Sequence, residues 1–234
     1  MLLFGSIIVS IIIIILLFLS SLFFPSLILE EKNLLRVRKI HDGTVIKIGG
    51  LTLLGSYACL FIIDNLFLNL IFIASLIVMI IGLIDDLTEI IPGPTRALFI
   101  FLVALILVHL TDIQIKGIDS FFIDKYILSY NFAAILFASL CLLMLTNGFN
   151  LIDGQHGLMT GVGIIIMLNF LLLVPEHVAN INEIITSILY ATCVLFLFNF
   201  FTGKIMSGDC GSNFLGFIIG SLVMYIYNIF YINP

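Results

Sequence analysis

The apolar residues of this chain gather in eight long runs, which short polar segments separate. The runs lie at roughly 2–24, 48–63, 66–84, 97–110, 131–146, 158–174, 184–201 and 213–231. A helix rises about 1.5 Å per residue, so about 20 apolar residues cross the hydrocarbon of a bilayer. We therefore predict an all-α, polytopic integral membrane protein, a bundle of about eight transmembrane helices surrounded by lipid.

Composition agrees with this prediction. Hydrophobic residues make up 62% of the chain and charged residues only 10%, a balance far from that of a soluble domain. The four cysteines lack the spacing of a zinc site or a disulfide framework. We find no long linker and no repeat, so we expect residues 1–234 to form one domain, and no basic surface that would bind nucleic acid.

The basic residues predict the orientation in the membrane. If successive helices alternate in direction, seven basic residues fall on one side and two on the other. The seven are Lys32, Arg36, Arg38, Lys39, Lys47, Arg96 and Lys204, and the two are Lys116 and Lys125. Cytoplasmic loops carry an excess of Lys and Arg, so the first side is predicted to be cytoplasmic.

Four unusual polar segments fall on that same side. They are the loop 25–47, "GLIDDLTE" at 82–89, "NGFNLIDGQHG" at 147–157 and "GKIMSGDCGS" at 203–212. The basic residues had sorted the loops without reference to these motifs. We therefore expect all four segments to converge on one site at the cytoplasmic face.

Asp85 and Asp86 lie at the C-terminal end of the third predicted helix, where the helix dipole disfavours a negative charge by about 0.3–1 kcal/mol. Adjacent carboxylates there repel unless they share a cation or a proton, so a divalent metal ion is a natural partner. The alternative is that they only mark the membrane interface.

Asp209 lies in a stretch rich in Gly and Ser that opens the last predicted helix. Free N–H groups at a helix N-terminus suit a phosphate, and a nearby carboxylate can hold the metal ion that the phosphate needs. The alternative is a simple N-cap followed by a turn.

Asn147, Asn150 and Asp153 follow one another at i, i+3 and i+6, so they share one face if the fifth helix continues through them. Amide side chains suit a neutral polar group such as a sugar or a nucleobase. A solvated turn is the alternative. Lys47, before the second predicted helix, is a candidate phosphate contact, although basic residues near a membrane often serve topology or anionic lipid.

Together these segments indicate metal-assisted chemistry on a phosphate ester, with a lipid as one substrate. In order along the chain, "RKIHDGTVIKIGG", "GLIDDLTE", "NGFNLIDGQHGL" and "GKIMSGDCGSNFLGF" resemble motifs of the polyprenyl-phosphate N-acetylhexosamine-1-phosphate transferases. The resemblance implies transfer of a sugar-1-phosphate, GlcNAc-1-phosphate being expected, from a UDP-N-acetylhexosamine to undecaprenyl phosphate, with release of UMP. It also implies the bacterial cytoplasmic (inner) membrane and the first lipid-linked step of surface-glycan or cell-wall synthesis.

The resemblance assigns roles position by position. Asp85, Asp86 and Asp153 are implied to be catalytic, and Asp209 and Asp86 to bind Mg²⁺, which Mn²⁺ could replace. The implied substrate-binding residues are Asn147, Asn150, His156, Lys47, Gly211 and Ser212. His156 stands where the family often has an acidic residue.

The length of the chain leaves other functions open. Family members commonly continue with two further helices and a loop that contains histidine, whereas this sequence ends at Pro234. The chain is therefore expected to be either a short form or a truncation at the C-terminus. A truncated inactive remnant, a non-catalytic scaffold and an ion-coupled transporter are the alternative functions, and a homodimer is a candidate assembly.

Overall fold

The computed structural model describes residues 2–23, 29–30, 45–61, 65–115, 117–174 and 179–232. Several residues that entered the orientation argument lie outside these ranges. They are Lys32, Arg36, Arg38, Lys39 and Lys116.

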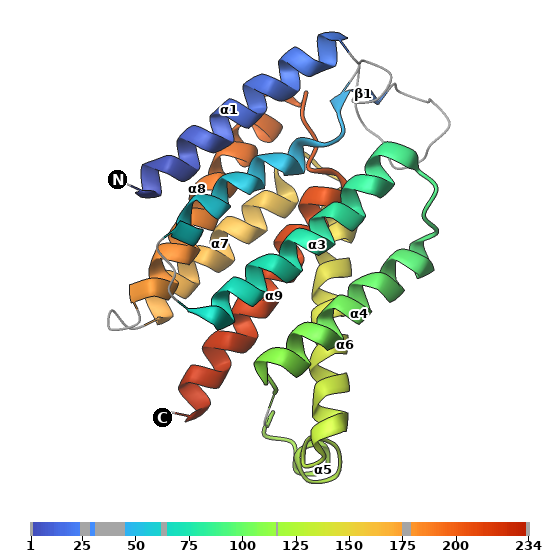
Figure 1. The fold of residues 1–234 in the computed structure, drawn as a ribbon, viewed down its shortest axis with the longest axis vertical. Coiled ribbons are helices and arrows are strands. Elements are labelled where there is room, and N and C mark those ends of the chain that lie inside the picture. The colour runs from blue at the N-terminus through green and yellow to red at the C-terminus, as the bar shows by residue number, and fades with distance from the viewer. Residues whose placement is uncertain are drawn as a thin grey trace.

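The prediction of an all-α, polytopic membrane bundle is confirmed (Figure 1). The long helices are α1 (Leu2–Phe23), α3 (Leu66–Thr88), α4 (Gly93–Thr111), α6 (Asn131–Ile152), α7 (Leu158–Leu173), α8 (Ala179–Thr202) and α9 (Gly208–Ile232). Shorter elements are the 3₁₀ helix η1 (Gly49–Phe61), α5 (Phe121–Ile123), the π-helical turn η2 (Asp124–Leu128) and the strands β1 (Leu29–Glu30) and β2 (Val45–Ile46). Over the described ranges, six helices are long and apolar enough to cross a membrane.

The two predicted spans that fall outside those six are α7 and η1. α7 has 16 residues and is shorter than a typical span. η1 has only 13 residues, but a 3₁₀ helix rises about 2.0 Å per residue, so it extends over roughly 26 Å. The tighter helix therefore covers much of the hydrocarbon thickness with fewer residues.

Some predicted boundaries were wrong by several residues. α4 begins at Gly93 instead of 97, because Pro94 occupies the first turn, where a missing N–H costs nothing. α6 continues to Ile152 instead of ending at 146, and α9 begins at Gly208 instead of 213. The ends of α6 and α9 therefore extend into polar motifs, because a polar side chain at a helix end can reach water or a partner.

α9 lies at the centre of the bundle, and residues 210–222 are all buried. It packs against α3, α6 and η1. At the crossing with η1, the backbones of Gly50 and Gly211 approach so closely that a Cβ built on Gly50 would lie 2.2 Å from Gly211 Cα. Small residues at a helix crossing in lipid allow such close packing.

Two hydrogen bonds join the helices around this core. Tyr57 Oη of η1 donates to the Phe72 carbonyl of α3 at 2.8 Å, and Ser187 Oγ of α8 donates to the Ser56 carbonyl at 3.0 Å. Polar side chains within a lipid-embedded bundle are satisfied by such bonds between helices.

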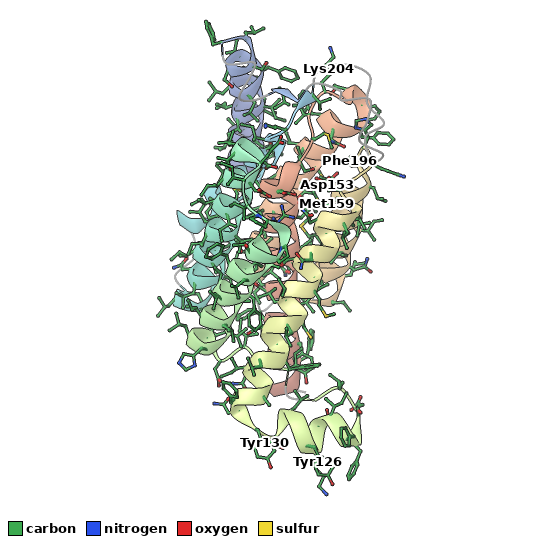
Figure 2. The ribbon with its side chains drawn as sticks, turned by 90° about the vertical axis from the view of Figure 1, so that its right-hand side faces the viewer. Tyr126, Tyr130, Asp153, Met159, Phe196 and Lys204 are labelled. Atoms are coloured by element: carbon green, nitrogen blue, oxygen red, sulfur yellow. The ribbon has the colours of Figure 1, made fainter. Side chains whose placement is uncertain are left out.

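The helices alternate in direction, so the C-terminus of α3, the N-terminus of α4, the C-terminus of α6 and the N-terminus of α9 meet at one end of the bundle (Figure 1). Asp153 and Lys204 lie toward this end, and Tyr126 and Tyr130 lie at the opposite end (Figure 2). The described parts of the four polar segments therefore come together, as the alternation predicted.

Candidate active site

A cavity of about 410 Å³ opens at this end of the bundle. Its described lining residues are Lys47, Asp85, Asp86, Glu89, Ile91, Asn150, Asp153, Met206, Gly208 and Asp209. Five of these side chains are carboxylates and one is an amine. A cavity with so many acids needs a cation before it can accept an anionic ligand, because like charges in a partly buried space repel strongly.

Asp86 holds the beginning of α9 in place. Its Oδ1 accepts a hydrogen bond from the Asp209 backbone N–H at 2.8 Å, and its Oδ2 accepts one from the Cys210 N–H at 2.9 Å. The first N–H groups of a helix have no partner within the helix, and a carboxylate also interacts favourably with the positive end of the helix dipole. Asp86 of α3 therefore caps α9 across the bundle and fixes the position of Asp209.

A short backbone ladder aligns the segment before η1 with the segment before α9. The Ile46 N–H donates to the Lys204 carbonyl at 2.9 Å, and the Met206 N–H donates back to the Ile46 carbonyl at 2.8 Å. Gly49 and Gly50 extend this pairing to the carbonyls of residues 206 and 207. The ladder brings Lys47 beside the start of α9, so Lys47 and Asp209 line the same cavity.

Gly208 is required by this close approach. Its φ of +68° is in the left-handed region, and a Cβ there would lie 2.2 Å from the Lys47 carbonyl and 2.7 Å from Asp86 Oδ2. Any side chain would therefore meet both strain and a backbone clash. The glycine before Asp209 allows α9 to begin directly against Asp86.

Arg96, in the first turn of α4, binds two of the carboxylates. Its Nη1 donates to Asp85 Oδ2 at 2.6 Å and also to Asp209 Oδ2. The Asp85 carboxylate has a second bond, because its Oδ1 accepts from the Ile91 N–H at 3.3 Å. Arg96 thus connects the paired aspartates of α3 to the aspartate of α9.

Asn150 connects α6 to the same carboxylate. Its Nδ2 donates to Asp209 Oδ1 and, at 2.9 Å, to Ser212 Oγ. The Ser212 hydroxyl in turn donates to the Gly208 carbonyl at 2.9 Å. Asp209 is therefore held from three directions, by α3, α4 and α6.

Asp153 follows the last residue of α6 and lines the cavity. Burial raises the pKa of its carboxyl from an ordinary value of 3.8 to about 8. The nearby Ser207 side chain lowers this pKa in part, and the nearby charge of Asp86 raises it. The C-terminal end of α6 adds a negative helix dipole. A cation beside Asp153 would relieve each of these costs.

Asn199, a buried residue of α8, ties together the two turns that follow α6 and α8. Its Oδ1 accepts from the Gly157 N–H at 2.5 Å, and its Nδ2 donates to the Ile205 carbonyl at 2.6 Å. Only 4% of its surface is exposed. Asn199 thereby stabilises both the turn that carries Asp153 and the segment that precedes Asp209.

The structure brings six of the predicted site residues to the cavity and places the other four elsewhere. Lys47, Asp85, Asp86, Asn150, Asp153 and Asp209 line it. Gly211 packs on the backbone of Gly50, and Ser212 is buried and accepts a hydrogen bond from Asn150. Asn147 is not among the lining residues, and the His156 ring lies beside Gly203. A role in substrate binding stays a prediction for these four, and the geometry favours a structural role for Gly211 and Ser212.

Two residues of this arrangement were not predicted from the sequence. Arg96 entered the prediction only as a basic residue that indicates orientation, and Asn199 was not singled out. A cation three residues into a helix is disfavoured by the helix dipole, so the position of Arg96 was an available signal. Asn199 lies within an apolar run, where a lone polar residue often indicates a bond between elements.

The donor set suits a hard divalent cation. Asp85, Asp153 and Asp209 offer carboxylate oxygens, which are the ligands that Mg²⁺ prefers, and no cysteine or histidine is among the described residues that line the cavity. Across the described residues, no three His, Cys, Asp or Glu side chains are gathered closely enough to hold a metal ion. Asp85 and Asp209 instead contact Arg96.

Comparison with known proteins places this geometry in context. A family model described as "Glycosyl transferase family 4" matches residues 68–227, which is more than half of the chain. The matched region contains every described cavity residue except Lys47.

Curated relatives are similar over the same region. A phospho-N-acetylmuramoyl-pentapeptide-transferase of Clostridium beijerinckii is 33% identical over 162 residues, covering 62% of this chain and 48% of the relative. A decaprenyl-phosphate N-acetylglucosaminephosphotransferase of Mycolicibacterium smegmatis is 27% identical over 164 residues, 64% of this chain and 39% of the relative. An archaeal protein of Saccharolobus solfataricus, whose name gives dolichyl phosphate as the acceptor, is 27% identical over 158 residues. The match covers 64% of this chain and 47% of the relative. The chain spans about half the length of the curated relatives it matches.

Proposed function

This chain belongs to glycosyl transferase family 4, and we propose that it transfers an N-acetylhexosamine-1-phosphate from a UDP-sugar to a polyprenyl phosphate. The observation that carries the proposal is the acid-lined cavity of about 410 Å³ at one end of a membrane bundle. Two of the relatives described above are named for a transfer of this kind, with decaprenyl phosphate or dolichyl phosphate as the acceptor.

The proposed reaction exchanges one phosphoanhydride bond for another. An oxygen of the lipid phosphate attacks the β-phosphorus of the UDP-sugar and forms a new P–O bond. The bond between the β-phosphorus and the bridging oxygen breaks, and UMP leaves with the electron pair. The products are UMP and a sugar diphospholipid, so atoms and charge balance without an oxidant or a further reactant. Catalysis of this step rests on positioning and on stabilising negative charge.

A bound Mg²⁺, for which Mn²⁺ could substitute, would offset the charge of the diphosphate and of the departing UMP. We propose that Asp209 and Asp153 hold it, since both line the cavity and offer oxygen ligands. Asp86 caps α9 and thereby positions Asp209, although its oxygens retain lone pairs that could also face the cation. Asn150 orients the Asp209 carboxylate through its Nδ2 group.

An apolar groove supplies a place for the lipid chain. It lies between α3 and α4, has a volume of about 110 Å³, and is lined by Leu70, Ile73, Ala74, Ile77, Val103, Ile106, Leu107 and Leu110. Along α3, the groove begins roughly 13 Å from Asp86 and ends roughly 24 Å from it, at about 1.5 Å per residue. Both helices end at the cavity, so we propose that a polyprenyl chain whose phosphate lies in the cavity runs along this groove.

The location follows from the proposed substrates. We propose that the chain acts in the cytoplasmic membrane of a bacterium with the cavity on the cytoplasmic side, where nucleotide sugars are made. The excess of Lys and Arg predicted for this side supports that orientation. UDP-N-acetylglucosamine is the donor that we test first, and surface-glycan or cell-wall synthesis is the pathway class that would use the product.

The test is transfer of labelled GlcNAc-1-phosphate from UDP-GlcNAc to undecaprenyl phosphate in membranes of a host that lacks its own transferase. We expect metal-dependent labelled lipid, and a loss of about 100-fold or more in kcat for Asp209→Asn. Asp112→Asn is the matched control, because it makes the same chemical change on an exposed residue at the opposite end of α4.

Loss of activity in both variants would point to damage of the fold instead of the site. A stable wild-type chain that transfers none of a panel of UDP-N-acetylhexosamines to undecaprenyl, decaprenyl or dolichyl phosphate would refute the proposal. The chain would then be better described as a non-catalytic scaffold or an inactive remnant.

A further inference from the structure

The first turn of α4 carries Arg96, whose guanidinium reaches carboxylates of two other helices. Arg96 Nη1 donates to Asp85 Oδ2 of α3 at 2.6 Å and to Asp209 Oδ2 of α9. The Arg96 side chain is 17% exposed, so water screens these ion pairs only in part. One nitrogen atom therefore serves two carboxylates that come from different helices.

The position of Arg96 on its own helix does not explain its charge. The N-terminus of a helix is the positive end of the helix dipole and disfavours a cation. A lysine or arginine there is stabilised only if anions surround it. Asp85 and Asp209 provide those anions, so the reason for this arginine lies in the cavity.

Most carboxylates of the described cavity already have a partner. The two oxygens of Asp86 accept backbone N–H groups, and Glu89 lies 3.7 Å from Lys47 Nζ. Arg96 partners Asp85 and Asp209. Hence a divalent cation that binds the Asp209 carboxylate must either displace the Arg96 guanidinium or share the carboxylate with it.

We infer that Arg96 is the counter-ion of Asp85 and Asp209 in the substrate-free protein, and that it competes with the divalent cation for Asp209. This inference rests on the proposed function, because it takes Asp209 as a ligand of that cation. When a nucleotide diphosphate enters, its phosphate oxygens offer the guanidinium another anionic partner, which a planar fork of N–H donors suits well. Release of Arg96 to the phosphate then leaves the Asp209 carboxylate to the cation.

The arrangement links the two ligands. The cation alone binds weakly, because it has to replace an existing ion pair. The diphosphate alone meets a cavity rich in carboxylates. Each ligand favours the binding of the other, and the coupling is reciprocal by thermodynamic necessity.

Mn²⁺ binding to the purified full chain in detergent tests the inference, with free Mn²⁺ measured by electron paramagnetic resonance. We expect Arg96→Gln to bind Mn²⁺ about tenfold more tightly than the wild type in the absence of nucleotide, because a charge-assisted hydrogen bond to Asp209 has been removed. Lys47→Gln is the matched control. It removes the same single charge from the cavity wall, but its partner is Glu89 and not Asp209.

Equal tightening in the two variants would overturn the inference, since it would show a general effect of charge. An unchanged affinity in Arg96→Gln would overturn it as well. Arg96→Lys keeps the charge and provides a second variant if the glutamine variant does not fold. The ammonium of lysine is a more strongly hydrated point charge on a shorter side chain, so it should hold Asp209 more weakly than Arg96 does. The Mn²⁺ affinity of Arg96→Lys should therefore fall between those of the wild type and Arg96→Gln.

The transfer assay separates this inference from the proposed function. The expected Mn²⁺ pattern in a chain that transfers no sugar phosphate would support the role of Arg96 and refute the activity. Active wild-type protein without the Mn²⁺ pattern would refute the role of Arg96 alone. Adding Asp209→Asn to Arg96→Gln should abolish the gain in affinity, because the carboxylate that was released is then absent.

Discussion

Replacing Asn199 by Leu should destabilise the bundle more than a substitution of any other amide residue that we consider. The side chain is 4% exposed and bonds two backbone groups, the Gly157 N–H and the Ile205 carbonyl. Those partners belong to the backbone, so the substitution cannot remove them. Both residues are buried, and water cannot replace the amide.

The magnitude follows from the two groups left without partners. An unsatisfied buried donor or acceptor costs about 1–3 kcal/mol, so Asn199→Leu should lower the free energy of unfolding by about 2–6 kcal/mol. In a chain of this size, that loss corresponds to a decrease in Tm of roughly 4–24 °C. Asn199→Asp keeps the acceptor for Gly157, but it places a carboxylate oxygen against the Ile205 carbonyl and must bury a charge or take up a proton, so its decrease should be at least as large.

Thermal unfolding of the purified variants in detergent measures this effect. Asn169→Leu is the matched control, because Asn169 is exposed and, among the described residues, donates to the Ile165 carbonyl of its own helix. We expect a shift of less than about 2 °C for the control. An Asn199→Leu protein that unfolds at the same temperature as the control would refute the reasoning that Asn199 satisfies these two groups.

Three further predictions concern the cavity and the groove. Asp153→Asn should raise Tm at pH 7 without metal by roughly 4–16 °C. A carboxyl whose folded pKa is about 8 instead of 3.8 costs no stability below pH 3.8, an increasing amount up to pH 8 and a constant amount above it, and this cost is of the order of 2–4 kcal/mol at pH 7. A Tm difference from the wild type that shrinks as pH rises from 5 to 8 would contradict this sign. Gly208→Ala should lower both Tm and the sugar-phosphate transfer activity. The left-handed φ of this position costs an alanine about 1–2 kcal/mol, and the clash with the Lys47 carbonyl adds to that cost. Thermal unfolding and the transfer assay measure the two effects. Ile106→Trp, on the exposed side of the groove, should raise KM for undecaprenyl phosphate about threefold or more and leave KM for a short-chain prenyl phosphate unchanged. Equal effects on both acceptors would argue against the groove as the site of the lipid chain.

The class of fold was predictable from the amino-acid sequence. In lipid, every backbone polar group must find a partner inside the protein, so long apolar runs can only be helices. Alternation of those helices then decides which loops share a side. For this reason the motifs at 82–89, 147–157 and 203–212 could be assigned to one end of the bundle from hydropathy and charge alone.

Helix ends were less predictable. The runs ended where apolar residues ended, whereas α6 continues through Asn150 and α9 begins before Asp209. A helix that leaves the hydrocarbon can continue through polar residues, because water, a cap or a neighbouring helix satisfies them. Hydropathy reports the lipid boundary and not the hydrogen bonds that end a helix.

The partners of the site residues were decided by the tertiary structure alone. Asp86 caps a helix that begins more than 120 residues later in the chain, and Arg96 binds Asp209 across 113 residues. Asn199 forms hydrogen bonds with Gly157, 42 residues before it in the chain, and with Ile205, six residues after it. The local sequence pattern shows which residues are polar and on which side of the membrane they lie. A hydrogen bond, however, depends on atomic positions within a few tenths of an ångström. Only the packing of the helices around one another, α3, α4, α6, α8 and α9, provides those positions.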